Sequence, residues 1–497
     1  MKAAPLMIQG THSDAGKSVL TAGLCRVFAR QGFKTAPFKS QNMALNSYIT
    51  ADGLEIGRAQ GMQAEACGIE ADTDMNPILL KPSGYNRSQV VVNGKVLRAM
   101  EATEYREQYF EKGLQTVTDA YNRLASRTER IVIEGAGSPA EINLQDREIV
   151  NMRIARMADA PVLLAADIDR GGVFASIVGT LELLSKADRK RVKGFIINKF
   201  RGDQSLLQPG LDWLEEYTGK PVAGLMPYLP DLRLEEEDSL GLASYGKETA
   251  GRDLDIAVIR FPYLSNYTDL DPFRFEPDCA VRFVERPEQL GEPDLLILPG
   301  SKTTVADGQF LRTSGLNKAI AKKAGEIPII GICGGYQLLG KTVEDPSAAD
   351  AELKLCQGLN LVPEMYTVMN PEKTTVRMSA SVNWEREVHP LTGYELHMGQ
   401  TVHRAPVWLS GGSHGSSAAV NNVYGTYMHD IFHNDTFRHA LLDSLRRQKA
   451  LPPVRRVNVS EEKTKAFDRL ADAVEAHLDM ELIERLMNEG RQTDELA

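Results

Sequence analysis

A glycine-rich loop near the N-terminus constrains the fold of this chain more than any other segment. Gly10-Thr11-His12-Ser13-Asp14-Ala15-Gly16-Lys17-Ser18 follows the apolar run Leu6–Gln9 and precedes a helical pattern over Val19–Arg30. Backbone N–H groups at a helix N-terminus form a concave anion site, to which Lys17 adds a charge for the β- and γ-phosphates. The Ser18 hydroxyl suits Mg²⁺. We therefore expect a strand–loop–helix unit that binds a nucleotide through Gly10, Thr11, Asp14, Ala15, Gly16, Lys17 and Ser18.

Short apolar runs alternate with longer segments of helical spacing along the rest of the chain. The runs are Leu6–Gln9, Ile131–Glu134, Val162–Ala165, Gly194–Asn198, Ile256–Arg260, Leu295–Pro299 and Ile329–Cys333. Brief, nearly continuous apolar runs are typical of parallel strands that are buried on both faces. The pattern predicts an α/β fold built from βαβ units, with a local hairpin where Asn-Gly interrupts Val90–Val96.

Composition excludes several classes of partner. Acidic residues number 67 and basic residues 57, and the net charge of −10 argues against nucleic acid or an anionic membrane as the partner. No apolar run reaches the roughly 18 residues of a membrane span. The five cysteines include no CxxC pair and form no disulfide framework. We expect a cytoplasmic enzyme, and no sequence feature fixes its oligomeric state.

A polar, turn-rich stretch between Leu232 and Asp253 interrupts the apolar pattern. It predicts a linker over 233–252, between an ATP-binding domain over 1–232 and a second α/β domain over 253–448. The remaining residues, 449–497, predict a helical tail.

The tail carries one apolar face. Ser460 is expected to cap a helix on which Phe467, Leu470, Val474 and Leu478 lie on one side. We expect this face to dock on its own domain rather than on a partner.

Five residues separate Gly10 from Gly16, where the strict phosphate-loop pattern has four. The expanded loop resembles that of dethiobiotin synthetase and its relatives, which activate a carboxyl or carbamate group with ATP. Glu134-Gly135-Ala136-Gly137 resembles their second motif, in which the acid at the strand end holds Mg²⁺. The resemblance also implies a role for Lys39 on the substrate side and for Asp52 at the metal.

Asn198-Lys199 begins like the guanine motif N-K-x-D, but position 201 is Arg. Guanine specificity is therefore unsupported. Asn198 is a candidate for reading an adenine edge, and a turn-forming role at the strand end is the alternative.

A second candidate site is centred on Cys333. The segment 329–340 predicts a buried strand, a sharp turn and a helix, and Gly331-Ile332-Cys333-Gly334-Gly335 has the spacing of a nucleophile elbow with sulfur in place of the serine oxygen. A helix N-terminus favours the reactive thiolate. The other cysteines lack such surroundings and are expected to be structural; they are Cys25, Cys67, Cys279 and Cys356.

A thiolate nucleophile needs a group that moves protons. His429, at the end of the strand-like run 424–429, is the first candidate, and His397 is the second. No His/Cys cluster has the spacing of zinc ligands.

The elbow and the His motif resemble the class I glutamine amidotransferases, whose Cys attacks the carboxamide of glutamine, forms a thioester and releases ammonia. The resemblance implies a flavodoxin-like second domain and an oxyanion hole with donors from Gly300, in Pro299-Gly300-Ser301-Lys302, and from Gly334. The acid that this class carries two residues after the His is replaced by Ile431. Glu395, Asp430 and a site without an acid all stay open.

Further motifs extend the resemblance along the chain. They are Gln9–Asn46, Lys81-Pro82-Ser83, Gln89–Gly94, Glu134–Asn143, Asp167–Gly172, Asn198–Asp203 and Ser265–Asp269. With the elbow and the His motif they resemble the cobyric acid synthase family of cobalamin biosynthesis. The resemblance implies that ATP and Mg²⁺ activate the b, d, e and g carboxylates of adenosylcobyrinic acid a,c-diamide as acyl phosphates. It also implies that Cys333 releases ammonia from glutamine to form each amide, giving adenosylcobyric acid.

Three alternatives stay open. Cobyrinic acid a,c-diamide synthase has the same two-part architecture and other target carboxylates. A ParA-like ATPase switch would have an inert second domain, which the intact elbow at Cys333 argues against. A carboxylase of the dethiobiotin type would leave the second domain without a role.

Overall fold

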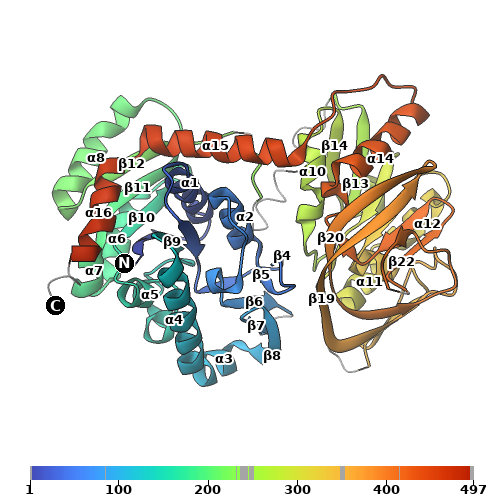
Figure 1. Ribbon diagram of the computed structural model, residues 1–497, viewed down its shortest axis with the longest axis horizontal. Coiled ribbons are helices and arrows are strands. Elements are labelled where there is room, and N and C mark those ends of the chain that lie inside the picture. The colour runs from blue at the N-terminus through green and yellow to red at the C-terminus, as the bar shows by residue number, and fades with distance from the viewer. Residues whose placement is uncertain are drawn as a thin grey trace.

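The computed structural model describes residues 3–83, 86–230, 232–235, 245, 251–346, 353–413 and 415–492. Figure 1 shows two sheet-based halves side by side, the N-terminal half in blue to green and the C-terminal half in yellow to orange. The red helix α15 (Val459–His477) runs from the second half back across the first. Most of the predicted linker, 236–244 and 246–250, lies outside the described residues.

The first half is organised around a six-stranded parallel sheet in the order β12-β11-β10-β1-β9-β2. Its strands are β1 (Ala4–Gly10), β2 (Thr35–Phe38), β9 (Arg130–Glu134), β10 (Val162–Asp167), β11 (Val192–Phe200) and β12 (Val222–Pro227). Its helices are α1 (Lys17–Arg30), α2 (Arg58–Cys67), α3 (Ala102–Gln108), α4 (Phe110–Arg127), α5 (Met152–Met157), α6 (Val173–Leu183), α7 (Lys186–Arg191) and α8 (Gln204–Thr218), with 3-10 turns η1 (Thr73–Met75) and η2 (Ile142–Arg147). The predicted apolar runs of this half are therefore confirmed as buried parallel strands.

Two small sheets extend the first half toward the second (Figure 1). One has the order β3-β6-β7-β8, and the other pairs β4 with β5. Their strands are β3 (Gln41–Met43), β4 (Ser47–Ile49), β5 (Glu55–Gly57), β6 (Ile78–Pro82), β7 (Arg87–Val92) and β8 (Lys95–Glu101). The predicted hairpin is confirmed between β7 and β8, where Asn93 and Gly94 have φ angles of 47° and 77°.

The second half has a six-stranded sheet in the order β14-β13-β15-β16-β23-β22, parallel except for β22. Its strands are β13 (Leu254–Ile259), β14 (Cys279–Val284), β15 (Leu295–Leu298), β16 (Ile329–Ile332), β22 (Ser417–Val420) and β23 (Val423–Thr426). Its helices are α10 (Asp271–Phe275), α11 (Thr304–Thr313), α12 (Leu316–Lys323), α13 (Gly334–Leu338) and α14 (Asp435–Gln448), with 3-10 turns η3 (Tyr267–Leu270), η4 (Pro287–Gln289) and η5 (Ile431–His433). The α/β prediction is confirmed here too.

A further sheet, in the order β18-β17-β19-β20-β24, was not expected from the sequence. Its strands are β17 (Thr342–Glu344), β18 (Leu355–Gln357), β19 (Tyr366–Trp384), β20 (Glu387–Val402) and β24 (Met428–His429), and β21 (Leu409–Ser410) pairs with β19. The long β19–β20 hairpin lies on the side of the second half that faces the first (Figure 1).

The tail helices α15 and α16 (Met480–Gln492) pack on the first half, although they follow the second half in sequence. Leu470 and Val474 share a buried cluster with α1, where the absent side chain of Gly23 leaves room: a Cβ there would lie 2.7 Å from Val474 Cγ2. The helix starts earlier than predicted, because Asn458 and not Ser460 is the cap and accepts a hydrogen bond from the Glu461 N–H at 3.0 Å.

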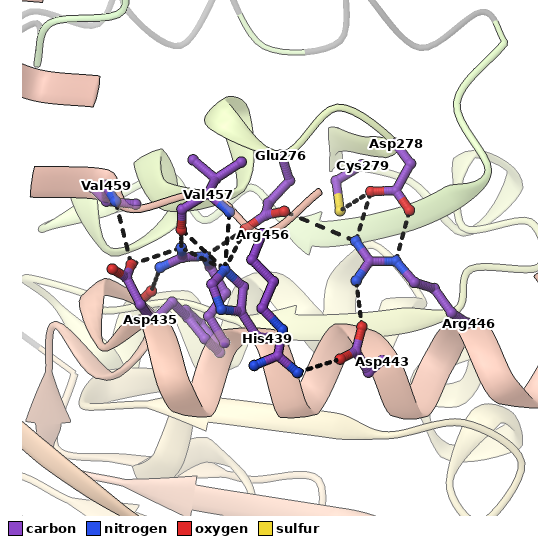
Figure 2. A network of polar contacts seen from close by, with 12 residues as sticks. Glu276, Asp278, Cys279, Asp435, His439, Asp443, Arg446, Arg456, Val457 and Val459 are labelled. Carbon is purple, nitrogen blue, oxygen red and sulfur yellow. Dashed lines mark hydrogen bonds and ion pairs between the residues drawn. The ribbon is translucent and has the colours of Figure 1, made fainter. Parts of the chain in front are cut away.

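Buried ion pairs anchor α14, and a hydrogen bond from one of their arginines reaches the segment that connects α14 to α15. Figure 2 shows Arg446 donating two hydrogen bonds to Asp278, both 2.8 Å long. Arg438 is fully buried and donates to Glu276 and to the Val457 carbonyl, each at 2.8 Å. Because each buried guanidinium has hydrogen-bonded partners, the cost of removing it from water is offset.

The large apolar cores of the two halves are separate, and a small cluster of Ile49, Tyr394 and Leu396 joins the halves. Within the described ranges no helix combines the length and hydropathy that a membrane crossing needs.

Candidate active site

The phosphate loop joins β1 to α1, as the sequence predicts. Gly16 has φ = 91°, and a Cβ on it would lie only 2.0 Å from the side-chain nitrogen of Asn198. Asn198 donates from that nitrogen to the Ala15 carbonyl at 2.9 Å. Glycine is therefore required at position 16 both for the left-handed backbone and for the close approach of Asn198, whose amide supports the loop.

Lys17 brings the phosphate loop and the second motif together. Its buried ammonium donates to the His12 carbonyl at 3.0 Å and to the Gly137 carbonyl at 3.2 Å. Asp14, at the rim of the loop, pairs with Arg170 at 3.0 Å. The Thr11 hydroxyl oxygen is buried and has no hydrogen-bond partner among the described residues. The loop residues thus surround a polar site at the end of β1.

Glu134, at the end of β9, is the buried carboxylate of this site. Its Oε1 accepts hydrogen bonds from the Ser18 hydroxyl at 2.8 Å and from the Lys39 ammonium at 2.9 Å. Its Oε2 accepts from Gln63 at 2.6 Å. Burial raises the pKa of such a carboxyl, but Lys39 and these hydrogen bonds outweigh it and hold the pKa of Glu134 below its ordinary value.

Gln63 was not found from the sequence, because it lies within a buried helix and belongs to no motif. Its side-chain oxygen is buried and has no hydrogen-bond partner in the part of the chain that the structure describes. Such an orphaned oxygen beside a carboxylate is consistent with a further polar ligand in the site.

Asp52 does not belong to this group, and its expected place at the metal is not what the structure shows. It is exposed in the turn between β4 and β5, and its carboxylate accepts a hydrogen bond from the Thr50 hydroxyl at 2.5 Å. That turn points Asp52 to solvent, whereas Glu134 is buried. Over the described ranges, no three His, Cys, Asp or Glu side chains are grouped so that they could hold a metal.

Cys333 occupies a strained turn between β16 and α13, with φ = 51° and ψ = −108°. The strand–turn–helix predicted for the elbow is therefore present. The turn requires glycine at position 335, because a Cβ there would lie 1.9 Å from the Leu298 carbonyl oxygen. The Cys333 thiol is nearly buried and faces the Leu396 carbonyl at 3.4 Å.

His429 is completely buried beside Cys333. Its Nδ1 lies 2.7 Å from Asp269 Oδ2, and its Nε2 is buried without a hydrogen-bond partner in the described ranges. Burial lowers the pKa of an imidazole, but the charges of Asp269 and of the Cys333 sulfur outweigh it and raise the pKa of His429 to about 10. The arrangement favours an imidazolium at His429.

The structure thus supplies a third group that the sequence left open. That group is Asp269, in η3. The two earlier candidates contact other histidines: Glu395 lies 3.5 Å from His397, and the Asp430 carboxylate lies 3.7 Å from His433. His397 itself stacks on Tyr427 with ring centroids 3.6 Å apart. The run Ser265–Asp269 stood out in the sequence, but no spacing rule linked its acid to His429.

Gly300 and Gly334, the two candidate oxyanion donors, both border the Cys333–His429 site. A Cβ on Gly300 would lie 3.3 Å from His429 Cε1, and one on Gly334 would lie 2.8 Å from the Ser301 backbone nitrogen. Gly334 is also the first residue of α13, next to Cys333. The two backbones are therefore close enough to share one site.

The pocket beside Cys333 has walls from both halves of the chain. Lys81 and Gln89 come from the first half, and the second half contributes residues that include Gln337 and Lys373. The site is thus complete only when the halves are in contact.

Comparison with known proteins gives matches over the whole chain. Residues 6–241 match the CobQ/CobB/MinD/ParA nucleotide binding domain, and residues 255–437 match the CobB/CobQ-like glutamine amidotransferase domain. A cobyric acid synthase of Geobacillus sp. (strain WCH70) is 54% identical over 494 residues, which cover 98% of each chain. One from Anoxybacillus flavithermus is 53% identical, covering 100% of this chain and 99% of its own. One from Dehalococcoides mccartyi (strain CBDB1) is 48% identical, covering 98% and 99%. The chain therefore belongs to the cobyric acid synthase family of glutamine-dependent, amide-forming enzymes of cobalamin biosynthesis.

Proposed function

We propose that this enzyme amidates the b, d, e and g carboxylates of adenosylcobyrinic acid a,c-diamide to give adenosylcobyric acid, with one ATP and one glutamine for each amide. The observation that carries the proposal is the pocket beside Cys333, which the ATP-binding half and the glutaminase half build together. A chain whose two halves worked independently would have no need of a shared pocket.

In the glutaminase half, the Cys333 thiolate attacks the carboxamide carbon of glutamine, and the backbone N–H groups of Gly300 and Gly334 stabilise the oxyanion. The C–N bond then breaks as the His429 imidazolium protonates the leaving nitrogen, which gives ammonia and a thioester. His429 next deprotonates a water that attacks the thioester, so glutamate leaves and the thiolate and imidazolium return. Asp269 holds the imidazole ring in the required orientation throughout.

In the ATP-binding half, a corrinoid carboxylate oxygen attacks the γ-phosphorus of ATP, and ADP leaves. Ammonia attacks the carbonyl carbon of the resulting acyl phosphate, loses a proton and displaces phosphate. Lys17 would offset the charge that develops on the phosphates, and Lys39, which donates to Glu134 at 2.9 Å, would serve the substrate carboxylate. Asn198 supports the loop that binds the nucleotide.

The residues at the phosphate loop suit Mg²⁺. Ser18 and Glu134 supply hard oxygen ligands 2.8 Å apart. The side-chain oxygens of Thr11 and Gln63, which find no partner among the residues that the structure describes, are consistent with further polar ligands. Mg²⁺ is commonly held by one or two carboxylates together with substrate phosphates, so a single acid is sufficient. When bound, the ion would neutralise charge on the transferring phosphoryl group, and Ser18 and Glu134 would hold it.

We further propose domain boundaries at 1–232, 233–252, 253–448 and 449–497, and a location in the cytoplasm. The separate sheets of the two halves support the boundaries. The five cysteines are free and buried, which suits a reducing compartment.

The test is an amidation assay with purified enzyme, ATP, Mg²⁺, glutamine and each candidate corrinoid acid, with products identified by mass spectrometry. We expect adenosylcobyrinic acid a,c-diamide to gain amides at its four remaining target carboxylates. Amidation of cobyrinic acid only at the a and c carboxylates would instead identify the diamide synthase activity. ATP hydrolysis on binding a protein partner, with no corrinoid amidated, would identify a switch.

A further inference from the structure

A buried carboxylate, Glu55, lies where the two halves meet. Its Oε1 accepts hydrogen bonds from Lys81 at 2.8 Å and from the Ser47 hydroxyl at 2.6 Å, both in the first half. Its Oε2 lies 2.5 Å from the ammonium of Lys373, which comes from β19 in the second half. The side chains of Glu55, Lys81 and Lys373 are only 1%, 3% and 9% exposed. Glu55 therefore links one lysine from each half.

The cluster holds one carboxylate and two ammonium groups. Burial raises the pKa of a carboxyl, but Lys373 and Lys81 hold the pKa of Glu55 well below its usual range. Burial lowers the pKa of Lys373 to about 7, although Glu55 opposes the shift. Buried ion pairs are weak evidence for stability, because the desolvation cost cancels much of the attraction. Stability alone therefore does not account for the cluster.

Both lysines that Glu55 binds also line the pocket of Cys333. Gln89, next to Lys81 in the same small sheet, approaches the sulfur of Met398 on the opposite wall at 3.7 Å. On a third side, the Ser47 N–H donates to the Asn266 side chain at 2.9 Å, in the loop that leads to Asp269. The contacts around Glu55 thus hold a wall of the glutaminase pocket that comes from the ATP-binding half.

The same segment reaches the phosphate site. Glu55 begins β5, which runs directly into α2, and α2 carries Gln63 to its hydrogen bond with Glu134. One continuous piece of chain therefore contacts the two lysines of the glutaminase pocket at its start and the candidate metal carboxylate further on.

We propose that Glu55 is a positioning residue for nitrogen transfer: by binding Lys81 and Lys373 it keeps the Cys333 pocket closed at the contact between the halves, so that ammonia released there reaches the ATP-binding half instead of solvent. This inference rests on the proposed function, because it assumes that nitrogen released at Cys333 is used in the other half. Closed sites exclude water and prevent the loss of reactive intermediates.

The test measures glutamate formed per amide formed, with glutamine as the nitrogen source. Lys373→Met removes the contribution of the second half and leaves Glu55 paired with Lys81, so one buried carboxylate faces one buried ammonium. We expect the glutamate-to-amide ratio to rise roughly threefold or more, because an open pocket loses ammonia. Lys373→Arg, which keeps the cation, should restore most of the coupling.

Arg377→Met is the matched control. Arg377 lies on the same strand and also contacts the first half, donating to the Ile49 carbonyl at 2.9 Å, but it does not line the Cys333 pocket. Its loss should leave the ratio at the wild-type value. An equal rise in this control would overturn the proposal, because any weakened contact between the halves would then have the same effect.

An unchanged ratio in Lys373→Met overturns the proposal, whether the overall rate stays the same or falls. If that variant does not fold, Lys81→Met, which leaves the Glu55–Lys373 pair, takes its place with the same expected rise and the same overturning result. Failure of the proposed function is seen separately, since wild-type enzyme would then amidate no corrinoid at all.

Discussion

Asp269 and His429 form a buried pair in which Asp269 Oδ2 lies 2.7 Å from His429 Nδ1, although the two residues are 160 positions apart in the chain. The second carboxylate oxygen of Asp269 accepts a hydrogen bond from the Asp430 N–H at 2.8 Å, which fixes the acid against the strand end that carries the histidine. Because Nδ1 donates to the carboxylate, Nε2 is the nitrogen left for proton transfer near Cys333.

Asp269→Asn should lower glutamine-dependent amidation by roughly 10²- to 10⁴-fold, because an amide partner favours the wrong tautomer of His429. Steady-state rates with glutamine and with ammonium chloride would show whether the loss is confined to glutamine. Asp430→Asn is the matched control: Asp430 has φ = 62°, which Asn tolerates, and its carboxylate contacts His433 rather than His429. Equal losses in both variants would contradict the assignment of Asp269.

The same pair predicts how stability depends on pH. Burial alone would lower the pKa of His429, but Asp269 and Cys333 raise it to about 10, whereas the unfolded chain has the ordinary value near 6.5. Protonated His429 therefore stabilises the fold fully below pH 6.5, and the contribution is lost as the pH rises toward 10. Urea midpoints across this range should fall less steeply in Asp269→Asn than in wild type. Parallel curves would contradict the prediction.

Lys17→Met should lower amidation by roughly 10²-fold or more with glutamine and with ammonium salts alike, because both routes need the phosphates of ATP to be bound and neutralised. The measurement is the amide formation rate at saturating ATP with each nitrogen source. Wild-type rates with ammonium would show that the phosphate loop does not serve the amidation step.

Glu134→Gln should raise the Mg²⁺ concentration needed for half-maximal amidation by roughly tenfold or more, because the carboxylate that accepts the Ser18 hydrogen bond is lost. Asp52→Asn is the control, since Asp52 is exposed in the turn between β4 and β5 and should leave the Mg²⁺ dependence unchanged. A Mg²⁺ titration of both variants shows whether Glu134 or Asp52 is the metal carboxylate. A shift with Asp52→Asn alone would reverse the assignment.

The features predicted well from the sequence are those in which neighbouring residues determine the geometry. The phosphate loop and the Cys333 elbow each combine a buried strand, glycines for a tight turn and the start of a helix within a short segment. Their strands, turns and helices are therefore confirmed almost residue by residue.

The missed features depend on contacts between distant segments. Asp269, Gln63 and Glu55 gain their partners only when separate elements pack together, and no local spacing marks them. Asp52 was assigned to the metal by resemblance alone, and the resemblance did not reveal that the β4–β5 turn exposes its side chain to solvent. The tail was expected to dock, but the sequence did not show that α15 returns to the first half.

We propose that the ATP-binding half consumes the ammonia that Cys333 releases from glutamine. Cys333→Ala is measured with ¹⁵N-amide glutamine and, separately, with ¹⁵N-ammonium chloride, each with ATP, Mg²⁺ and adenosylcobyrinic acid a,c-diamide. We predict that the variant places no label from glutamine in the corrinoid product but still places label from ammonium. Incorporation from glutamine at the wild-type rate would contradict the account.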